Sequence, residues 1–269
     1  MPNNTTLLTR TGLDLDLAVF LAEACSTAYS SSAAVRLWAA ANGFGVRCTP
    51  FDHGNIQGYW CVADDVALIA FRGTSNPGQW LRDVRFFPIE HEWGLVHAGF
   101  KHGIEIAEPD LAAFEILAVK TGHVWITGHS LGGALAVMAA ARMKMHGINT
   151  ALYTYGQPRV GLGGFAGRFE AELAGKLIRF VNQSDVVPRV PPGLLYRHMG
   201  IIKHIVPGAL EGMSSDLAET EQEPLTDEEF AGLQQSLQQP GAEALEGMLP
   251  WLSDHSITEY VRLLEEIRG

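Results

Sequence analysis

Cysteine and long apolar runs are both scarce in this chain of 269 residues. It has three cysteines, Cys25, Cys48 and Cys61, and their spacing matches no metal-binding template. The odd count leaves at least one thiol unpaired and allows one disulfide; we expect three free thiols. No apolar run approaches the ~18 residues that a membrane-spanning helix needs. These absences argue against a transmembrane span and against a cysteine-bound metal.

Positive charge is also in short supply, with 19 Lys and Arg against 30 Asp and Glu and a formal net charge of −11. Such a surplus argues against nucleic acid or an anionic membrane as the main partner. It does not exclude adsorption to a neutral lipid surface, which depends on apolar area. The basic flank of a signal peptide is missing too, because Asp14 and Asp16 precede the apolar run LAVFLAEAC and Glu23 interrupts it. We expect a soluble chain whose export signal is absent or already removed.

What the chain does contain is an alternation of helix and strand patterns. The sequence is 47% hydrophobic and 18% charged, enough apolar material for a sizeable core. Strands are predicted at 56–63, 66–71, 124–127, 151–155, 176–181 and 201–206, and helices at 15–41 with a break at 30–32, then at 98–120, 131–146, 164–173 and 257–267. This order predicts a mainly parallel sheet with helices on both faces, an α/β fold spanning residues 1–269.

The stretch Gly128-His-Ser-Leu-Gly132 fits the pattern G-x-S-x-G between an apolar strand and a helix of small residues. The glycines are needed for steric reasons, because strand and helix approach closely at a strained turn that projects the serine hydroxyl. Ser130 is therefore a candidate nucleophile. The backbone N–H of Leu131, which follows it, is a candidate donor to the oxyanion of a tetrahedral intermediate.

A serine hydroxyl needs a base, and the base needs an orienting acid. In α/β-hydrolases with a G-x-S-x-G serine, the acid follows the serine in the sequence and the histidine follows the acid. Asp185 is the candidate acid, since it comes directly after a predicted strand. His146 is excluded as base because it lies at the far end of the helix that follows Ser130, away from the turn that projects the serine. The remaining histidines after the serine are His198, His204 and His255.

Several separate motifs occur in order along the chain: FRGT at 71–74, VHAGF at 96–100, GHSLGGALA at 128–136, YGQPRVG at 155–161, NQSDVVPRVPP at 182–192 and the dipeptide Asp254-His255. Taken together, they resemble the fungal-type triacylglycerol lipases, the class 3 lipase family of the α/β-hydrolase superfamily. The match runs from about residue 18 to residue 266. It implies an α/β-hydrolase fold.

The resemblance also implies roles for individual residues. Ser130 becomes the nucleophile, Asp185 the acid and His255 the base, with His198 the alternative base and otherwise a structural residue near the site. The second oxyanion donor of the family follows the Arg-Gly pair, which is Thr74 here. Asp254 is expected to be a bystander, and His129 and His97 to pack or hydrogen-bond rather than react.

The segment 75–84 aligns with the lid of the family and keeps its Trp-Leu-Arg-Asp core. Trp80 is expected either to cover the acyl pocket or to be ordinary core. The segment is short, so strong interfacial activation is in doubt.

An acidic stretch at about 209–248 departs from the simpler members of the family. It holds ten of the thirty acidic residues, and no Lys or Arg lies between His204 and Val261. About 40 residues are too few for an independent core, so we expect an insertion. A capping box at 226–229 begins a helix on which Phe230, Leu233 and Leu237 share one face. That face is expected either to line a second cap over the site or to belong to an external solvated helix.

The predicted function is hydrolysis of carboxylic esters of lipase type, through an acyl-enzyme on Ser130, acting on acylglycerols and related lipid esters. It requires no metal or organic cofactor and implies no protein partner. The alternatives are a feruloyl-type or small-ester esterase and, from another class, a non-catalytic binding protein with the same fold. The family resemblance suggests secretion, while the N-terminal sequence leaves a cytoplasmic location open.

Overall fold

The computed structural model describes residues 4–182, 185–192, 195–211, 223–238 and 250–269. Its centre is an eight-stranded sheet in the order β1-β2-β3-β6-β7-β9-β11-β12. These strands are β1 (Cys48–His53), β2 (Ile56–Ala63), β3 (Val66–Phe71), β6 (His123–His129), β7 (Ala151–Tyr155), β9 (Leu177–Asn182), β11 (Ile201–Val206) and β12 (Ala209–Glu211). The inner pairings from β3 to β11 are parallel and the outer ones antiparallel. The predicted mainly parallel sheet is confirmed.

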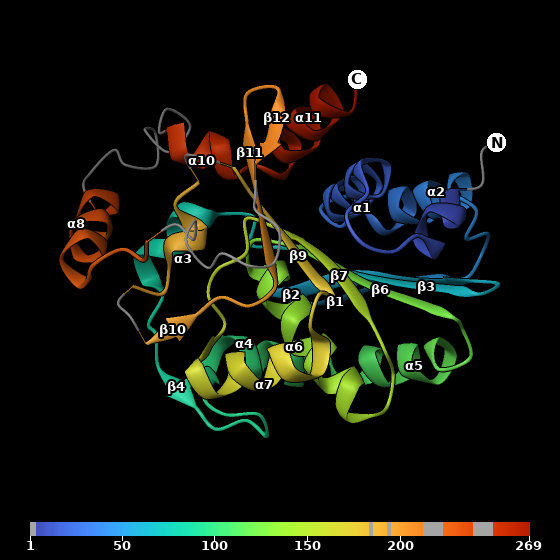
Figure 1. Cartoon of the computed structure of the whole chain (residues 1–269), viewed down its shortest axis with the longest axis horizontal. Helices are drawn as coiled ribbons and strands as arrows, with labels where there is room; N and C mark the ends of the chain where they lie inside the picture. The colour runs from blue at the N-terminus through green and yellow to red at the C-terminus, as the bar shows by residue number, and fades with distance from the viewer. Residues whose placement is uncertain (1–3, 183–184, 193–194, 212–222, 239–249) are drawn as a thin grey trace.

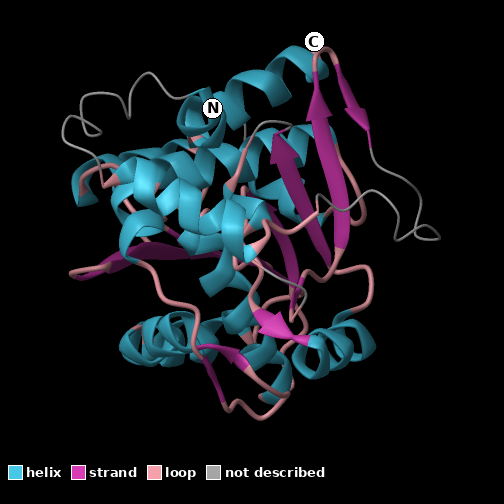
Figure 2. Ribbon diagram, turned by 90° about the vertical axis from the view of Figure 1, so that its left-hand side faces the viewer, coloured by secondary structure: helices cyan, strands magenta, loops and turns pink. Residues whose placement is uncertain are grey.

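Helices cover both faces of this sheet (Figure 1). On one face lie α1 (Leu15–Thr27), α2 (Ser32–Ala41) and α11 (Ile257–Arg268), and on the other α4 (Ala98–Ile106), α5 (Glu108–Ala118), α6 (Leu131–Met145) and α7 (Gly163–Leu173). Each helical layer buries its own apolar cluster against the sheet, so the core has two halves. Figure 2 shows the strands running between these layers in a view turned by 90°.

The remaining elements lie at the margins of the sheet. They are η1 (Asn4–Thr9), η2 (Val187–Arg189), α3 (Pro77–Asp83), α8 (Asp227–Leu237), α10 (Pro250–His255) and a second, four-stranded sheet of β10 (Tyr196–Arg197), β8 (Gly161–Leu162), β5 (Val96–His97) and β4 (Pro88–Ile89). None of these two-residue strands has enough length to show a period of two, so the sequence pattern did not predict them. Among the described residues, no helix is both long and apolar enough to cross a membrane.

The cysteine expectation was wrong. Cys48 and Cys61 form a disulfide, and Cys25 alone is a free, buried thiol. The reason is the strand β1, which the sequence analysis missed because Pro50 and Asp52 interrupt its apolar pattern. Its antiparallel pairing with β2 places Cys48 directly opposite Cys61, with Cα atoms 4.1 Å apart.

The acidic stretch is described only in part. Residues 212–222 and 239–249 of the expected insertion lie outside the described residues. Within the described part, α8 begins as predicted directly after its N-cap residue Thr226, whose side chain and that of Glu229 form a reciprocal capping box. Phe230 and Leu237 are buried and Leu233 is half-buried, so the predicted shared face is a packed one rather than a solvated one.

Candidate active site

Ser130 stands at the junction of β6 and α6 in the strained conformation that the sequence predicted. Its backbone has φ 59° and ψ −128°, a region that residues other than glycine rarely occupy. The flanking glycines are required by contact: a Cβ on Gly128 would lie 2.1 Å from the carbonyl oxygen of Gly132, and one on Gly132 would lie 2.2 Å from that of Phe71. The turn is held by the N–H of Ser130, which donates to the carbonyl of Tyr155 at 2.9 Å.

Asp185 and His255 meet directly, although 70 positions separate them in the chain. The Nδ1 atom of His255 is 2.8 Å from the Oδ2 atom of Asp185, and both side chains are buried. Asp185 accepts two further hydrogen bonds, from the Tyr260 hydroxyl at 2.7 Å and from the Val187 N–H at 2.9 Å. Three donors therefore orient this carboxylate toward the imidazole.

The Asp185–His255 pair lies beside the serine. Gly156 follows Tyr155, whose carbonyl holds Ser130, and a Cβ on Gly156 would lie 2.7 Å from the Asp185 carboxylate and 2.9 Å from His255 Nδ1. The hydroxyl oxygen of Ser130 and the Nε2 atom of His255 are both buried, and neither has a hydrogen-bond partner among the described residues. These are the two atoms between which a base would take a proton from a serine.

The serine and the histidine are closed off from solvent, since both are 0% exposed. Two cavities, of about 480 and 520 Å³, lie next to them. The first is lined by Thr74, Leu131 and Trp80 among others, and the second by Thr74, His129 and His255 among others.

Thr74 thus borders both cavities, and Leu131 borders one of them. As the first residue of α6, Leu131 has an N–H with no acceptor inside the helix. The Thr74 hydroxyl accepts from the Asn76 N–H at 3.3 Å and donates to the Asn76 carbonyl at 3.5 Å, which leaves the Thr74 N–H as the group available to a substrate. The two expected oxyanion residues therefore line the same cavity.

The other histidines considered as the base have different surroundings. His198 donates from Nε2 to the Pro188 carbonyl at 2.8 Å, and burial, with Arg179 and Arg159 nearby, lowers its pKa well below the usual value. His146 is bound to Glu115 on the surface. His204 lies within β11 rather than at the end of a strand.

His97 caps α4, where its Nδ1 accepts from the Gly99 N–H at 3.1 Å and its Nε2 donates to the Arg85 carbonyl at 2.9 Å. His129 is likewise hydrogen-bonded through both ring nitrogens. Both histidines are thus hydrogen-bonded, as expected. Asp254 contributes a backbone carbonyl, which accepts from the Asn182 amide at 3.0 Å.

Two of the buried histidines, His97 and His129, contribute to how stability depends on pH. His97 and His129 are each 3% exposed, and burial lowers the pKa of both below 6.5. Below about pH 6.5 the unfolded chain therefore binds protons that the folded protein does not. The free energy of unfolding should be flat above about pH 7 and fall below 6.5, by up to about 1.4 kcal/mol per pH unit for each histidine.

Urea unfolding at pH 8, 7, 6 and 5.5 measures this slope. The variant His97→Gln should show a shallower decline than the wild type. Replacing His102, whose side chain is 72% exposed, serves as the control and should leave the slope unchanged. Equal slopes in His97→Gln and the wild type would contradict the assignment.

Trp80 lies on the short helix α3 and lines the 480 Å³ cavity together with Leu131. It is half-buried and packs between the main core and a smaller apolar cluster. That cluster joins Leu81 of α3 and Val187 and Val190 of the loop after Asp185 to Phe230 and Leu237 of α8.

The helix α8 therefore packs on α3, as Figure 1 also shows at the left. The rings of Phe230 and Phe86 lie 5.1 Å apart. The side-chain amide of Gln234 donates to the carbonyls of Leu81 and Arg82, both at 3.1 Å, at the C-terminal end of α3. Phe230, Leu233 and Leu237 do not line either cavity; they cover α3 from outside.

Sequence reasoning missed Tyr260 and Tyr29. Tyr260 lies five positions after His255, and its hydroxyl connects the Asn182 N–H to Asp185. Tyr29, after the end of α1, hydrogen-bonds His129. Nothing local in the sequence marks either tyrosine, because each acts on a residue at least 75 positions away.

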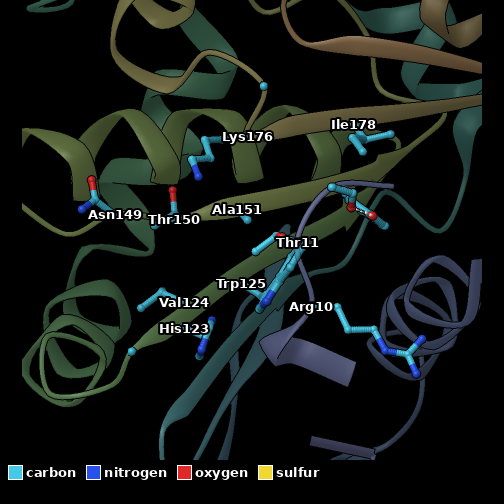
Figure 3. Close-up of a pocket in the computed structure, with 14 residues that line it drawn as sticks. Arg10, Thr11, His123, Val124, Trp125, Asn149, Thr150, Ala151, Lys176 and Ile178 are labelled. Atoms are coloured by element: carbon cyan, nitrogen blue, oxygen red, sulfur yellow. Dashed lines mark hydrogen bonds between the residues drawn. The ribbon is translucent and has the colours of Figure 1, made fainter. Parts of the chain in front are cut away.

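A third cavity, of about 150 Å³, lies at the opposite edge of the sheet, where β6 and β7 begin (Figure 3). Several of its polar groups already have partners within the protein: Arg10 pairs with Asp14 and Asp16, and the Tyr153 hydroxyl donates to the Gly12 carbonyl. We assign it no chemistry.

Residues 68–194 match the family model for lipase (class 3). A secreted mono- and diacylglycerol lipase of Fusarium solani is 36% identical over 139 residues, which cover 49% of this chain and 41% of that protein. A lipase of Rhizomucor miehei is 34% identical over 150 residues, which cover 51% of this chain and 41% of that protein. The chain thus spans less than half the length of these relatives.

Among solved structures, the mono- and diacylglycerol lipase MDLA of Penicillium cyclopium superposes with a TM-score of 0.64 at 23% identity, covering 78% of this chain and 91% of that one. A triacylglycerol lipase whose catalytic centre is described as a serine protease triad superposes with a TM-score of 0.63 at 22% identity, covering 79% and 90%. At this identity the likeness shows the fold, which is the expected α/β-hydrolase fold.

Proposed function

We propose that this chain is a serine carboxylic-ester hydrolase acting on acylglycerols and related lipid esters, because its residues 68–194 match the family model for lipase (class 3). The observation that carries the proposal is the buried Asp185–His255 pair beside the strained Ser130, with the serine oxygen and the His255 Nε2 atom left without partners.

The reaction follows from these positions. His255 takes the proton of Ser130 as its hydroxyl attacks the ester carbonyl, while Asp185 holds the imidazole in the tautomer that leaves Nε2 free. The N–H groups of Leu131 and Thr74 donate to the developing oxyanion. His255 then protonates the departing alcohol, and water repeats the cycle on the acyl-enzyme.

A rate profile on nitrophenyl esters from short to long acyl chains, beside an emulsified triglyceride, tests this proposal. Hydrolysis of long-chain esters and of the emulsion supports a lipase. Activity confined to acyl chains below about eight carbons would replace it with the second candidate, a small-ester esterase. The observation that favours that candidate is the polar lining of the 480 Å³ cavity, which includes Gln57, Arg72, Asn76 and Gln79.

We further propose that α3 is a lid and that α8 holds it closed. Ser130 is fully buried, Trp80 of α3 borders the adjoining cavity, and Gln234 of α8 binds the last carbonyls of α3. A net hydrogen bond of this kind contributes about 1 kcal/mol to the closed state.

The substitution Gln234→Ala should therefore raise the rate on a dissolved short-chain ester about fivefold, because less free energy is needed to open the lid. Initial rates below the solubility limit of the ester measure this effect. Gln235→Ala, on the exposed surface of the same helix, is the control and should match the wild type. Equal rates for the two variants would remove α8 from the control of access.

Export is our proposal for location. The Fusarium relative is named as secreted, and disulfides such as Cys48–Cys61 persist in oxidising compartments.

A further inference from the structure

His129 precedes Ser130 and uses both nitrogens of its ring. Its Nε2 atom is 2.6 Å from the backbone carbonyl oxygen of His255. Since a carbonyl oxygen only accepts, Nε2 carries the hydrogen. Burial lowers the pKa of His129 well below its usual value, as does the neighbouring His255, so the ring is neutral and Nδ1 is an acceptor.

The donor to that Nδ1 atom is the hydroxyl of Tyr29, at 2.8 Å. The same hydroxyl oxygen accepts the N–H of Gly73 at 3.1 Å. The packing here is close: a Cβ on Gly73 would lie 2.4 Å from the Tyr29 oxygen and 2.6 Å from the His129 carbonyl oxygen. The Arg72 guanidinium, 5.1 Å from the centroid of the Tyr29 ring, holds the ring from its face.

The hydrogen bonds all run in one direction. The Gly73 N–H donates to Tyr29, the Tyr29 hydroxyl donates to His129, and the opposite side of the His129 ring donates to His255. Gly73 directly precedes Thr74, the expected oxyanion donor. This series of hydrogen bonds therefore begins at the loop that carries Thr74 and ends at the backbone carbonyl of His255, the proposed base.

We propose that Tyr29 and His129 are positioning residues that fix the oxyanion loop and His255 relative to one another across Ser130. Neither side chain reacts with the substrate. Tyr29 favours the one tautomer of His129 whose Nε2–H reaches the His255 carbonyl. Rates of this chemistry depend on placement to within a fraction of an ångström, so loosening this connection lowers kcat more than it weakens binding. The inference rests on the proposed hydrolase function.

The first test compares Tyr29→Phe with Tyr59→Phe. Both substitutions remove one buried hydroxyl, but that of Tyr59 donates to the Ala24 carbonyl of α1 and lies outside the chain of bonds. In the full-length protein, Tyr29→Phe should lower kcat about 10- to 30-fold with KM within about twofold, and Tyr59→Phe should stay within about twofold in both. A kcat for Tyr29→Phe equal to that of the control would overturn the proposal.

The second test uses His129 itself. His129→Gln retains an N–H donor and should recover at least part of the kcat that His129→Leu loses. Because the two residues act in series, adding Tyr29→Phe to His129→Leu should lower kcat by less than about threefold more. Fully additive effects, or no advantage of glutamine over leucine, would contradict a shared positioning role.

A third measurement does not depend on activity. Nitrogen NMR of the His129 ring should show the Nε2–H tautomer in the wild type, with an unprotonated Nδ1 whose resonance moves in Tyr29→Phe and stays in Tyr59→Phe. A wild-type ring protonated at Nδ1 would overturn the proposal even if no Tyr29 variant folds. A protein that shows this signature but hydrolyses no ester would instead refute the proposed function and leave the hydrogen-bond chain intact.

Discussion

Replacing Ser130 with alanine should reduce ester hydrolysis to below a thousandth of the wild-type kcat/KM while the protein stays folded. The expected loss is this large because the other groups act through the serine: with no hydroxyl, the Asp185–His255 pair has no proton to take. In enzymes built this way, only the oxyanion donors and substrate binding then contribute, and the remaining rate is orders of magnitude lower.

Two measurements separate this result from simple unfolding. Thermal denaturation of Ser130→Ala should match the wild type within a few degrees, and a fluorophosphonate probe should label the wild type only. Ser32→Ala, an exposed serine at the start of α2, is the matched control. Residual activity above about a thousandth would show that another group is the nucleophile.

The second large effect distinguishes two histidines. His255→Ala should lower kcat/KM by about 10⁴-fold or more, because it removes the base and leaves the Asp185 carboxylate buried without its imidazole partner. His198→Ala should keep more than about a tenth of the activity, since its Nε2 already donates to the Pro188 carbonyl.

Rates on one nitrophenyl ester, with protein folding checked by circular dichroism, decide between these histidines. The order of the two variants is the outcome that counts, because any loss of stability affects both in the same direction. A larger loss in His198→Ala than in His255→Ala would mean that the base has been assigned to the wrong residue.

The site residues that could be predicted are those whose neighbours in the sequence mark them. Gly128 and Gly132 mark the elbow because each approaches backbone too closely for a side chain, and that requirement is visible in the sequence. Asp185 could be proposed because it comes just after a parallel strand, at the edge of the sheet where such sites form. His255 needed the order of the motifs and the family resemblance as well.

The parts that were not predictable depend on contacts between distant segments. The amphipathic pattern of α8 placed Phe230 and Leu237 on one face, but it left open whether that face is packed and did not show that its partner is α3. The disulfide required the register of β1 on β2, which three cysteines in a sequence do not reveal. Tyr29 and Tyr260 look like ordinary core aromatics until the fold brings them to His129 and Asp185.

The complete burial of Ser130 and His255 affects how substrate preference can be measured. If only an open form binds substrate, the apparent affinity of every dissolved ester is its intrinsic affinity multiplied by the open fraction. That fraction is a property of the protein and is common to all such esters. Ratios of kcat/KM between two dissolved esters therefore cancel this fraction, whereas a comparison of the same ester in dissolved and emulsified form would report the opening of the proposed lid.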